Sequence, residues 1–457
     1  MVTLDLLLLP PDMKQKKLFY TILVVLLVVA GYFLTTITFP KNASRYPAII
    51  ILLLIDYYVW GLFKKKVFTY HKLIKAATVF LYWLPFLMLV GTTIATYFVG
   101  TKSWNPLMRN ILFGSIFSFY VAKVLMAIIL GIADIFKVGK RVVHLFNKDK
   151  SSFEDGEMGK ITRAKFMERI AFVTGGLVVT TMFAGMFRWV HDFDVKDLFV
   201  KIKGLPNAFD GYKVVQISDL HLGTWSNIEP LKEAIQIIND INPDLIVFTG
   251  DLVNYTTDEA FRFKEVLSGL QAKDGVFAIL GNHDYGDYVN WPSKPEKQKN
   301  MEALYQFYNQ INWKLLRNEN AIISRGDDKI ALIGVENWSA NTRFPQYGNI
   351  LKASKGLGKV PVKILLSHDP SHWNSVVLDQ HKDINLMLAG HTHGFQFGIE
   401  IPGIKWSPAQ YIYNEWAGLY ENEASNQMLY VNRGLGSIGY PGRIGILPEI
   451  TVINLQS

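Results

Sequence analysis

The sequence predicts two units of different class: an N-terminal bundle of transmembrane α-helices in residues 1–190 and a C-terminal α/β sandwich in residues 200–457. Long apolar stretches fill the first part, whereas short apolar runs alternate with helical patterns in the second. The charge balance also changes, from 24 Lys and Arg against 12 Asp and Glu in residues 1–200 to 23 against 27 in residues 201–457. An acidic C-terminal part is not expected to bind nucleic acid. The chain has no cysteine, which excludes disulfides and thiolate metal sites.

Four long apolar stretches predict membrane-spanning helices, since each is close to the ~20 residues that a helix needs to cross a bilayer. These stretches are 18–37, 46–63, 77–99 and 111–135. A fifth stretch, 170–187, is shorter and contains three glycines, so it is either a short span or a buried helix. The membrane domain is therefore expected to have four or five transmembrane helices.

Positive charges between these stretches predict their orientation. Seventeen Lys and Arg lie before the first stretch, between the second and third, and between the fourth and fifth, against four in the opposite connections. The positive-inside rule then places the N-terminus and the segment 136–169 in the cytoplasm. If 170–187 spans, the C-terminal domain lies outside the cytoplasm, and we expect a multi-pass protein of the cell (inner) membrane.

Two charged residues fall inside the apolar stretches. Asp56 is near the middle of the second stretch and Lys123 near the middle of the fourth, and both stretches run in the same direction. Because lone charges in lipid are costly, we expect the two side chains to approach each other or to share a polar cavity. They would be a structural pin between helices or part of a transport or signalling function.

The C-terminal part alternates strand and helix patterns. Strands are expected at 213–218, 245–249, 276–280, 330–335, 363–367, 384–388 and 428–432. A helix is expected at 228–241, where apolar residues recur at helical spacing, and another from the capping box at 256–259 to Leu270. This alternation predicts two packed sheets with helices outside.

Polar clusters follow five of the apolar runs. They are Asp219-Leu220-His221, Gly250-Asp251, Gly281-Asn282-His283-Asp284, His368-Asp369 and Gly390-His391-Thr392-His393. Loops at the carboxyl ends of adjacent strands converge on one crevice, so these side chains are expected to meet. Carboxylate, carboxamide and imidazole ligands suit Mn, Fe or Zn, and a shared carboxylate can hold two ions about 3.5–4 Å apart, the spacing used for attack at phosphorus. The clusters therefore predict a binuclear metal site. Residues 285–325 are longer and more polar, with a helix-like pattern at 300–310, and are expected to form a cap beside the site.

These motifs resemble the motif set of the calcineurin-like metallophosphoesterase family, and they look closest to its membrane-anchored bacterial branch. Segments 205–211, 432–436 and 447–455 resemble the family's lead-in to the first strand and its last two strands. One departure is Gly394-Phe395-Gln396, where the family often has Gly-Gly-Gln. The departure affects the shape of the pocket more than metal binding. The fold implied for residues 200–457 is the metallophosphoesterase sandwich.

The resemblance implies a role for each position of the motifs. One divalent metal ion would be held by Asp219, His221, Asp251 and His393, and a second by Asp251, Asn282, His368 and His391. His283 would protonate the leaving oxygen, and Asp284 would orient and charge-stabilise His283. A metal-bridging hydroxide would be the nucleophile in the hydrolysis of a phosphoester or pyrophosphate bond.

Residues outside the motifs allow two interpretations each. Arg433 follows a strand near the site and would either clamp a substrate phosphate or form a structural salt bridge. The aromatic stretch 406–420 is either ordinary packing or a membrane-facing lip for a lipid-like substrate. His372 and His381 lack a motif and are expected to be ordinary structural residues.

Three functions stay open at this point. The first is a membrane-anchored phosphohydrolase acting on an envelope phosphodiester or pyrophosphate, such as a lipid-linked substrate. The second is a broad phosphodiesterase or phosphomonoesterase of soluble substrates, with the helices as an anchor only. The third is a membrane transporter or sensor whose C-terminal domain is regulatory, which the Asp56 and Lys123 pair would support.

Overall fold

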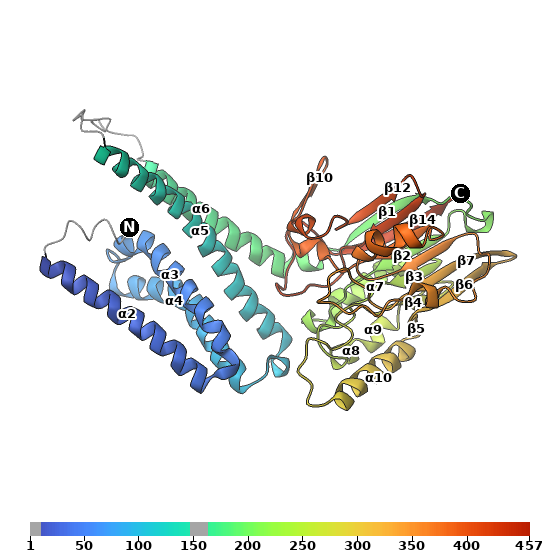
Figure 1. Ribbon diagram of the computed structural model, residues 1–457, viewed down its shortest axis with the longest axis horizontal. Helices are drawn as coiled ribbons and strands as arrows, with labels where there is room; N and C mark the ends of the chain where they lie inside the picture. The colour runs from blue at the N-terminus through green and yellow to red at the C-terminus, as the bar shows by residue number, and fades with distance from the viewer. Residues whose placement is uncertain (1–10, 147–162) are drawn as a thin grey trace. The chain divides into compact units, whose positions relative to one another are not determined.

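The computed structural model describes residues 11–146 and 163–457 of the chain (Figure 1). The chain separates into two compact units, Met1–Phe183 and Ala184–Ser457. The first unit is helical, and the second combines two large β-sheets and a small two-stranded one with flanking helices. The predicted fold class, an apolar helical region followed by a mixed α/β domain with two sheets, is confirmed.

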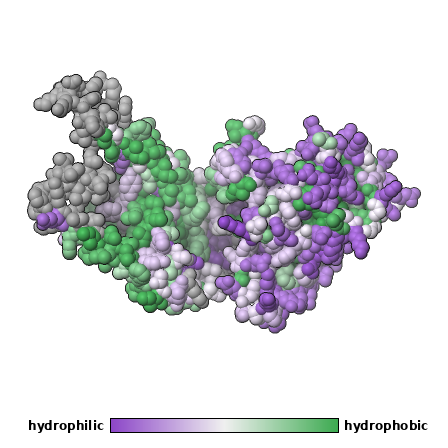
Figure 2. All heavy atoms as spheres, in the orientation of Figure 1, coloured by the Kyte–Doolittle hydropathy of each residue, from purple (hydrophilic) through white to green (hydrophobic). Residues whose placement is uncertain are grey.

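Long apolar helices build the first unit. They are α2 (Pro11–Thr38), α3 (Tyr46–Val67), α4 (Lys72–Phe98), α5 (Pro106–Phe146) and α6 (Arg163–Phe187), whose last turn, from Ala184, belongs to the second unit. Their outward side chains are largely apolar, as the hydrophobic colouring in Figure 2 shows, with Leu54 63% exposed and Phe80 57% exposed. A helix in water hides such side chains, so this surface is made for lipid.

The described residues contain four helical segments that are long and apolar enough to cross a membrane. These are Asn42–Val67, Lys72–Phe98, Pro106–Gly139 and Lys165–His191. Three of them contain the predicted spans 46–63, 77–99 (apart from its last residue) and 111–135, and the fourth contains the uncertain stretch 170–187. The first predicted stretch lies in α2, where the apolar helix Ile22–Thr38 is shorter.

The two charged residues of the helical unit form a buried ion pair. Lys123 Nζ contacts Asp56 Oδ1, and the Asp56 side chain is fully buried. The Tyr120 hydroxyl donates to Asp56 Oδ2 at 2.8 Å, and Lys123 Nζ also donates to the Tyr82 carbonyl at 3.1 Å. The prediction that Asp56 and Lys123 approach each other is confirmed. Because both charges have close partners, the contacts favour the structural pin between α3, α4 and α5.

Two six-stranded sheets form the second unit within the described residues. The first has the order β1 (Asp194–Lys201), β14 (Glu449–Gln456), β2 (Lys213–Ile217), β3 (Leu245–Phe248), β4 (Val276–Ala278), β5 (Trp313–Leu315). The second has the order β12 (Gly418–Asn422), β13 (Gln427–Val431), β9 (Leu386–Ala389), β8 (Lys363–Leu366), β7 (Asp328–Gly334), β6 (Glu319–Arg325). All seven predicted strands are present. β2, β3 and β4 are parallel to one another, as are β7, β8 and β9.

The continuous apolar runs are explained by burial on both faces of each sheet. In β3, Leu245 and Val247 pack in the core between the sheets, whereas Ile246 and Phe248 pack in a second core with the outer helices. The helices of that second core include α7 (Glu229–Asp240) and α10 (Lys294–Gln310). The second sheet has its own outer core beside α11 (Ile350–Ala353) and α12 (Leu378–Gln380).

Two expectations for this unit need correction. The helix expected from 256 to 270 is divided into α8 (Asp258–Phe261) and α9 (Lys264–Leu267). Residues 285–325 do not form a separate cap, because α10, β5 and β6 belong to the cores and edges of the two sheets. β5 has only three residues and β6 has four polar residues among its seven, so neither forms an apolar run that would reveal it.

Candidate metal centre

The predicted ligands leave the carboxyl ends of parallel strands. Asp219 and His221 follow β2, Asp251 follows β3, Asn282 follows β4, His368 follows β8, and His391 and His393 follow β9. Several of them have a left-handed backbone, with φ of 52° at Asp219, 60° at Asp251 and 74° at His391. Residues other than glycine rarely adopt this conformation, and such strain is typical of functional sites. These tight turns direct ligands from different strands into one buried space.

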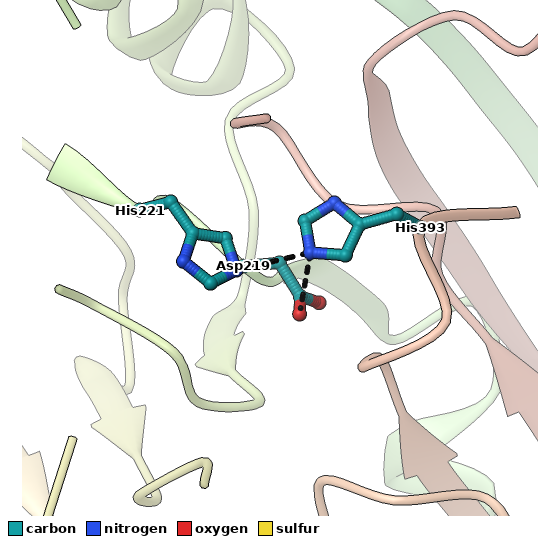
Figure 3. A group of neighbouring side chains, drawn as sticks. All are labelled: Asp219, His221 and His393. Atoms are coloured by element: carbon teal, nitrogen blue, oxygen red, sulfur yellow. Dashed lines mark hydrogen bonds and ion pairs between the residues drawn. The ribbon is translucent and has the colours of Figure 1, made fainter. Parts of the chain in front are cut away.

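The first group of ligands consists of Asp219, His221 and His393 (Figure 3). The Nε2 atoms of His221 and His393 are 3.0 Å apart, and His393 Nε2 is 3.3 Å from Asp219 Oδ1. All three side chains are buried. One ligand atom from each residue lies within 4.8 Å of the others, which is the arrangement that a single divalent ion needs.

The second group consists of Asp251, His368 and His391. His368 Nε2 is 3.2 Å from Asp251 Oδ2 and 3.2 Å from His391 Nδ1. The same Asp251 oxygen is 3.6 Å from His221 Nε2 in the first group. Asp251 therefore lies between the two groups, as a bridging ligand must.

The side-chain amide of Asn282 indicates whether these residues fit a metal ion. Its Nδ2 donates to the Tyr288 hydroxyl at 2.8 Å, which fixes the orientation of the amide. Its buried Oδ1 has no hydrogen-bond partner among residues 11–146 and 163–457. A buried amide oxygen without a partner is costly unless another group binds it. The oxygen and nitrogen donors of the site thus fit two divalent ions such as Mn, Fe or Zn.

The buried charges of the centre influence one another strongly. Burial acts to raise the pKa of Asp251, but the imidazoles of His368 and His283 hold it well below its usual value. Burial acts to lower the pKa of His368, but the carboxylates of Asp251 and Asp219 raise it to about 10. The field of the carboxylates therefore favours positive charge at the centre, which two cations would supply.

Hydrogen bonds behind the ligands fix the orientation of the imidazoles. His368 Nδ1 is 2.7 Å from the Thr249 carbonyl, so Nδ1 carries the proton and Nε2 faces the site. His391 has the opposite orientation, with Nε2 at 2.8 Å from the Tyr413 hydroxyl and Nδ1 toward His368. These outer partners hold the ligand nitrogens in place.

The partner of His283 differs from the expected one. Its Nδ1 is 2.8 Å from the Asn254 carbonyl, and no bond to the Asp284 carboxylate occurs among the described residues. The Asp284 carboxylate instead accepts hydrogen bonds from backbone N–H groups, namely those of Asp251, Leu252, Val253 and Gly281. Burial and the nearby Asp251 raise the pKa of Asp284 to about 7. Asp284 thus holds two ligand loops together, and the carbonyl of Asn254 orients His283.

Arg443 is a residue whose role the sequence did not reveal. Its guanidinium is fully buried and donates to the carbonyls of Gly434 at 2.9 Å and Leu447 at 3.2 Å. Its Nη2 is also 3.5 Å from Nδ1 of the predicted ligand His393. Burial lowers the pKa of Arg443 to about 9. The contact is invisible in the sequence because 50 residues separate Arg443 from His393.

Arg433 is held by carboxylates. Its Nη1 pairs with Glu449, and its Nη2 is 2.6 Å from Glu400. These contacts agree with the structural salt bridge, and the role as a substrate clamp stays a prediction. His372 is an ordinary core residue, as expected, with its ring stacked on Trp338 at 4.5 Å and Nδ1 at 2.9 Å from Ser367 Oγ.

Comparison with known proteins defines the class of this protein. Residues 212–395 match the calcineurin-like phosphoesterase family, and residues 42–189 match a family described as a probable calcineurin-like phosphoesterase, transmembrane domain. The chain belongs to the calcineurin-like phosphoesterases and is a metal-dependent phosphoester hydrolase with a transmembrane domain. The predicted family is thereby confirmed.

Particular relatives occur in bacteria and animals. The uncharacterized metallophosphoesterase YkuE of Bacillus subtilis is 31% identical over 312 residues, which cover 66% of this chain and 99% of YkuE. The transmembrane protein with metallophosphoesterase domain of Danio rerio is 30% identical over 288 residues, covering 61% of this chain and 62% of the relative. The UDP-2,3-diacylglucosamine pyrophosphatase LpxG of Chlamydia trachomatis is 29% identical over 322 residues, covering 58% of this chain and 93% of LpxG.

Proposed function

We propose that this protein hydrolyses a phosphoester or pyrophosphate bond in a lipid-linked substrate, at a binuclear metal centre on the outer side of the cell membrane. The observation that carries the proposal is the position of Asp251. One of its carboxylate oxygens is 3.2 Å from His368 Nε2 and 3.6 Å from His221 Nε2, so a single side chain reaches both ligand groups. Two ions held in this way would supply an activated water and would neutralise charge on the phosphoryl oxygens.

The leaving oxygen requires a proton, and His283 is placed to donate one. Its Nδ1–H donates a hydrogen bond to the Asn254 carbonyl, which leaves Nε2 to carry the transferable proton. The ring lies beside His221 of the first ligand group, with centroids 4.9 Å apart. His283 is half-buried, whereas the ligands around it are mostly buried, so a substrate can reach it. We assign it the role of general acid.

The lipid-linked substrate is supported by the chain's relatives and by its membrane helices. LpxG, with 29% identity, is named for pyrophosphatase action on UDP-2,3-diacylglucosamine, an acylated nucleotide sugar. A membrane-bound enzyme meets acylated substrates where they are concentrated, in the plane of the bilayer. A soluble phosphodiester remains the alternative substrate class.

The charges of the sequence support an extracytoplasmic position for the catalytic unit. The basic segments 64–75 and 136–169 contain the N-terminal ends of α4 and α6, respectively, so both segments are proposed to be cytoplasmic. α6 then carries the chain to the opposite side. This assignment does not depend on whether α2 crosses the membrane. A peptide tag attached after residue 457 would test it, since the tag should be accessible to a reagent that stays outside the cell.

Hydrolysis by the full chain in lipid nanodiscs tests the proposed function. Three substrates separate the possibilities: bis-p-nitrophenyl phosphate, an acylated UDP-sugar, and the same UDP-sugar without acyl chains, each with Mn²⁺. We expect hydrolysis of all three, with the highest kcat/KM for the acylated substrate, and none with Asp251→Asn. Equal kcat/KM with and without acyl chains would favour soluble substrates. A metal-loaded protein that hydrolyses none of them would support the sensor or transporter alternative.

A further inference from the structure

A small hairpin beside the metal centre has one fully apolar face. β10 (Ile399–Ile401) and β11 (Ile404–Trp406) pair only with each other and belong to neither large sheet. Their register places Ile401 opposite Ile404 and Ile399 opposite Trp406. Because side chains alternate along a strand, these four share one face, and the Glu400–Lys405 pair lies on the other. The three isoleucines are 48–55% exposed, and Figure 2 shows the hydrophobic cluster at the place of this hairpin.

The apolar surface continues through the residues that lead into the hairpin and follow it. Phe395 is 54% exposed, Phe397 is 44% exposed, and Ile412, after the hairpin, is 63% exposed. We call this surface the apolar lip; it consists of Phe395, Phe397, Ile399, Ile401, Ile404 and Ile412. It borders the metal centre at both ends, since His393 precedes Phe395 by two residues and Tyr413, the partner of His391, follows Ile412.

The backbone is strained where the lip begins. His393, Gly394, Phe395 and Gln396 all have φ between 51° and 59°. A run of left-handed residues is unfavourable at every residue other than glycine. The Gln396 side chain stabilises the turn by donating to the carbonyls of Tyr440 at 2.8 Å and Gly442 at 2.9 Å. This strained turn points a large apolar side chain, Phe395, into solvent.

The loop that bonds to this strained turn also bonds to the end of a membrane helix. The Arg443 N–H donates to the Gly185 carbonyl in the last turn of α6 at 3.2 Å. The next residue, Ile444, donates from its N–H to the Gln396 carbonyl at 2.8 Å and accepts from the Gly398 N–H at 2.9 Å. A side chain at position 185 would meet the Arg443 carbonyl at 2.7 Å, so the helix end and the loop are in close contact. The loop at 443–444 therefore connects the residues where the lip begins, Gln396 and Gly398, to the C-terminal end of α6.

We infer that the apolar lip inserts into the leaflet of the bilayer from which α6 emerges. A two-stranded hairpin of three-residue strands is marginally stable in water, and an exposed apolar face makes it less so. Lipid next to the end of α6 removes that face from water. Trp406 and Tyr411 at the edge of the lip have the amphipathic rings that are enriched at the membrane interface. This inference goes beyond the proposed function, since the lip can insert whether or not the substrate carries acyl chains.

Insertion would bring the metal centre to the membrane surface. The strained turn that starts the lip also contains the predicted ligand His393, and His391 bonds to Tyr413 directly after Ile412. Phosphoryl groups at the level of lipid headgroups would then lie at the same depth in the membrane interface as the predicted metal ligands. The lip thus determines which part of a membrane-embedded molecule reaches the centre.

The absence of native cysteine allows a direct test in the full chain. Single variants Ile401→Cys and Ile404→Cys are labelled with a nitroxide and reconstituted in nanodiscs of phosphatidylcholine and phosphatidylglycerol. Accessibility to oxygen, which concentrates in lipid, is compared with accessibility to a water-soluble nickel chelate. Matched control positions are Leu351 and Ile322, which are apolar, 77% and 45% exposed, and on elements remote in sequence from the lip. Hydrolysis of bis-p-nitrophenyl phosphate by each variant establishes that it is folded.

The expected result is an oxygen-to-nickel ratio at 401 and 404 roughly tenfold above that at 351 and 322, as for a segment inserted in the interface. A ratio equal to that of the controls overturns the inference. Spin–spin broadening that grows with the number of copies per disc would show that a second copy covers the lip instead. A ratio that rises only when an acylated substrate is added would mean that the lip binds the substrate's chains and not the bilayer. The comparison of 401 and 404 with 351 and 322 does not depend on the proposed substrate being correct.

Discussion

Replacing Lys123 by methionine removes the cation of the buried pair in the helical unit. Asp56 is fully buried, and the Lys123 side chain is only 8% exposed. Breaking a buried pair by removing one partner typically costs ~3–5 kcal/mol, because the remaining charge is uncompensated. Asp56 keeps the Tyr120 hydroxyl at 2.8 Å, and a hydrogen bond to a charged group contributes ~1.5–3 kcal/mol. We therefore expect Lys123→Met to lower the free energy of unfolding by about 3 kcal/mol.

The double variant Asp56→Leu/Lys123→Met separates charge from packing. With both charges removed, no buried charge lacks a partner, so we expect stability within about 1 kcal/mol of the natural protein. Lys137→Met is the matched control, because the Asp134–Lys137 pair at 2.9 Å is far more exposed and should contribute under ~1 kcal/mol. Unfolding in mixed micelles at increasing dodecyl sulfate, followed by circular dichroism, gives the free energy of unfolding of the two single variants and the double variant. If Lys123→Met unfolds like the control, the pair does not hold the bundle and the structural-pin interpretation is refuted.

The remaining predictions concern the catalytic unit. Asp251→Asn should abolish hydrolysis and lower the affinity for both ions in a metal titration; loss of only one ion would contradict the bridging position. His283→Ala should slow turnover by roughly 10²–10⁴-fold with the metal content unchanged by elemental analysis; release of metal would show that His283 is a ligand. Burial lowers the pKa of His372 to about 3, so this imidazole stays neutral in the fold. Between that value and its unfolded pKa near 6.5 the unfolded chain binds the extra proton, so stability should fall as pH drops below about 6.5. His372→Gln should flatten this dependence in chemical denaturation, and an unchanged slope would refute the assignment.

The fold could be predicted from the sequence, and so could the position of the candidate ligands at the ends of strands, because both follow from local pattern. Each polar cluster stands directly after a run of apolar residues, and strands with both faces buried make such runs. Asp251 could be placed after β3 without any knowledge of what faces it. The seven strands that were found in advance lie inside the two sheets, whereas the edge strands β5, which has three residues, and β6, which mixes polar and apolar residues, were missed.

Two contacts between distant segments could not be predicted. Arg443 approaches His393 from a glycine-rich loop that carries no pattern of its own. Asp284 was expected to hold His283, its neighbour in sequence, but its carboxylate is turned toward the loop that follows β3. In both cases the orientation of a side chain depends on the packing of two loops, and sequence adjacency gives no information about it.

The four backbone bonds accepted by Asp284 have a consequence for the supply of metal. They tie the turn that carries Asp251 to the turn that carries Asn282, with lengths of 2.9–3.3 Å, through protein groups alone. Loops that already have their final shape lose little freedom when an ion arrives. One kind of ion can then be exchanged for another without rebuilding the loops. Metal loading of the folded protein should therefore need no refolding step.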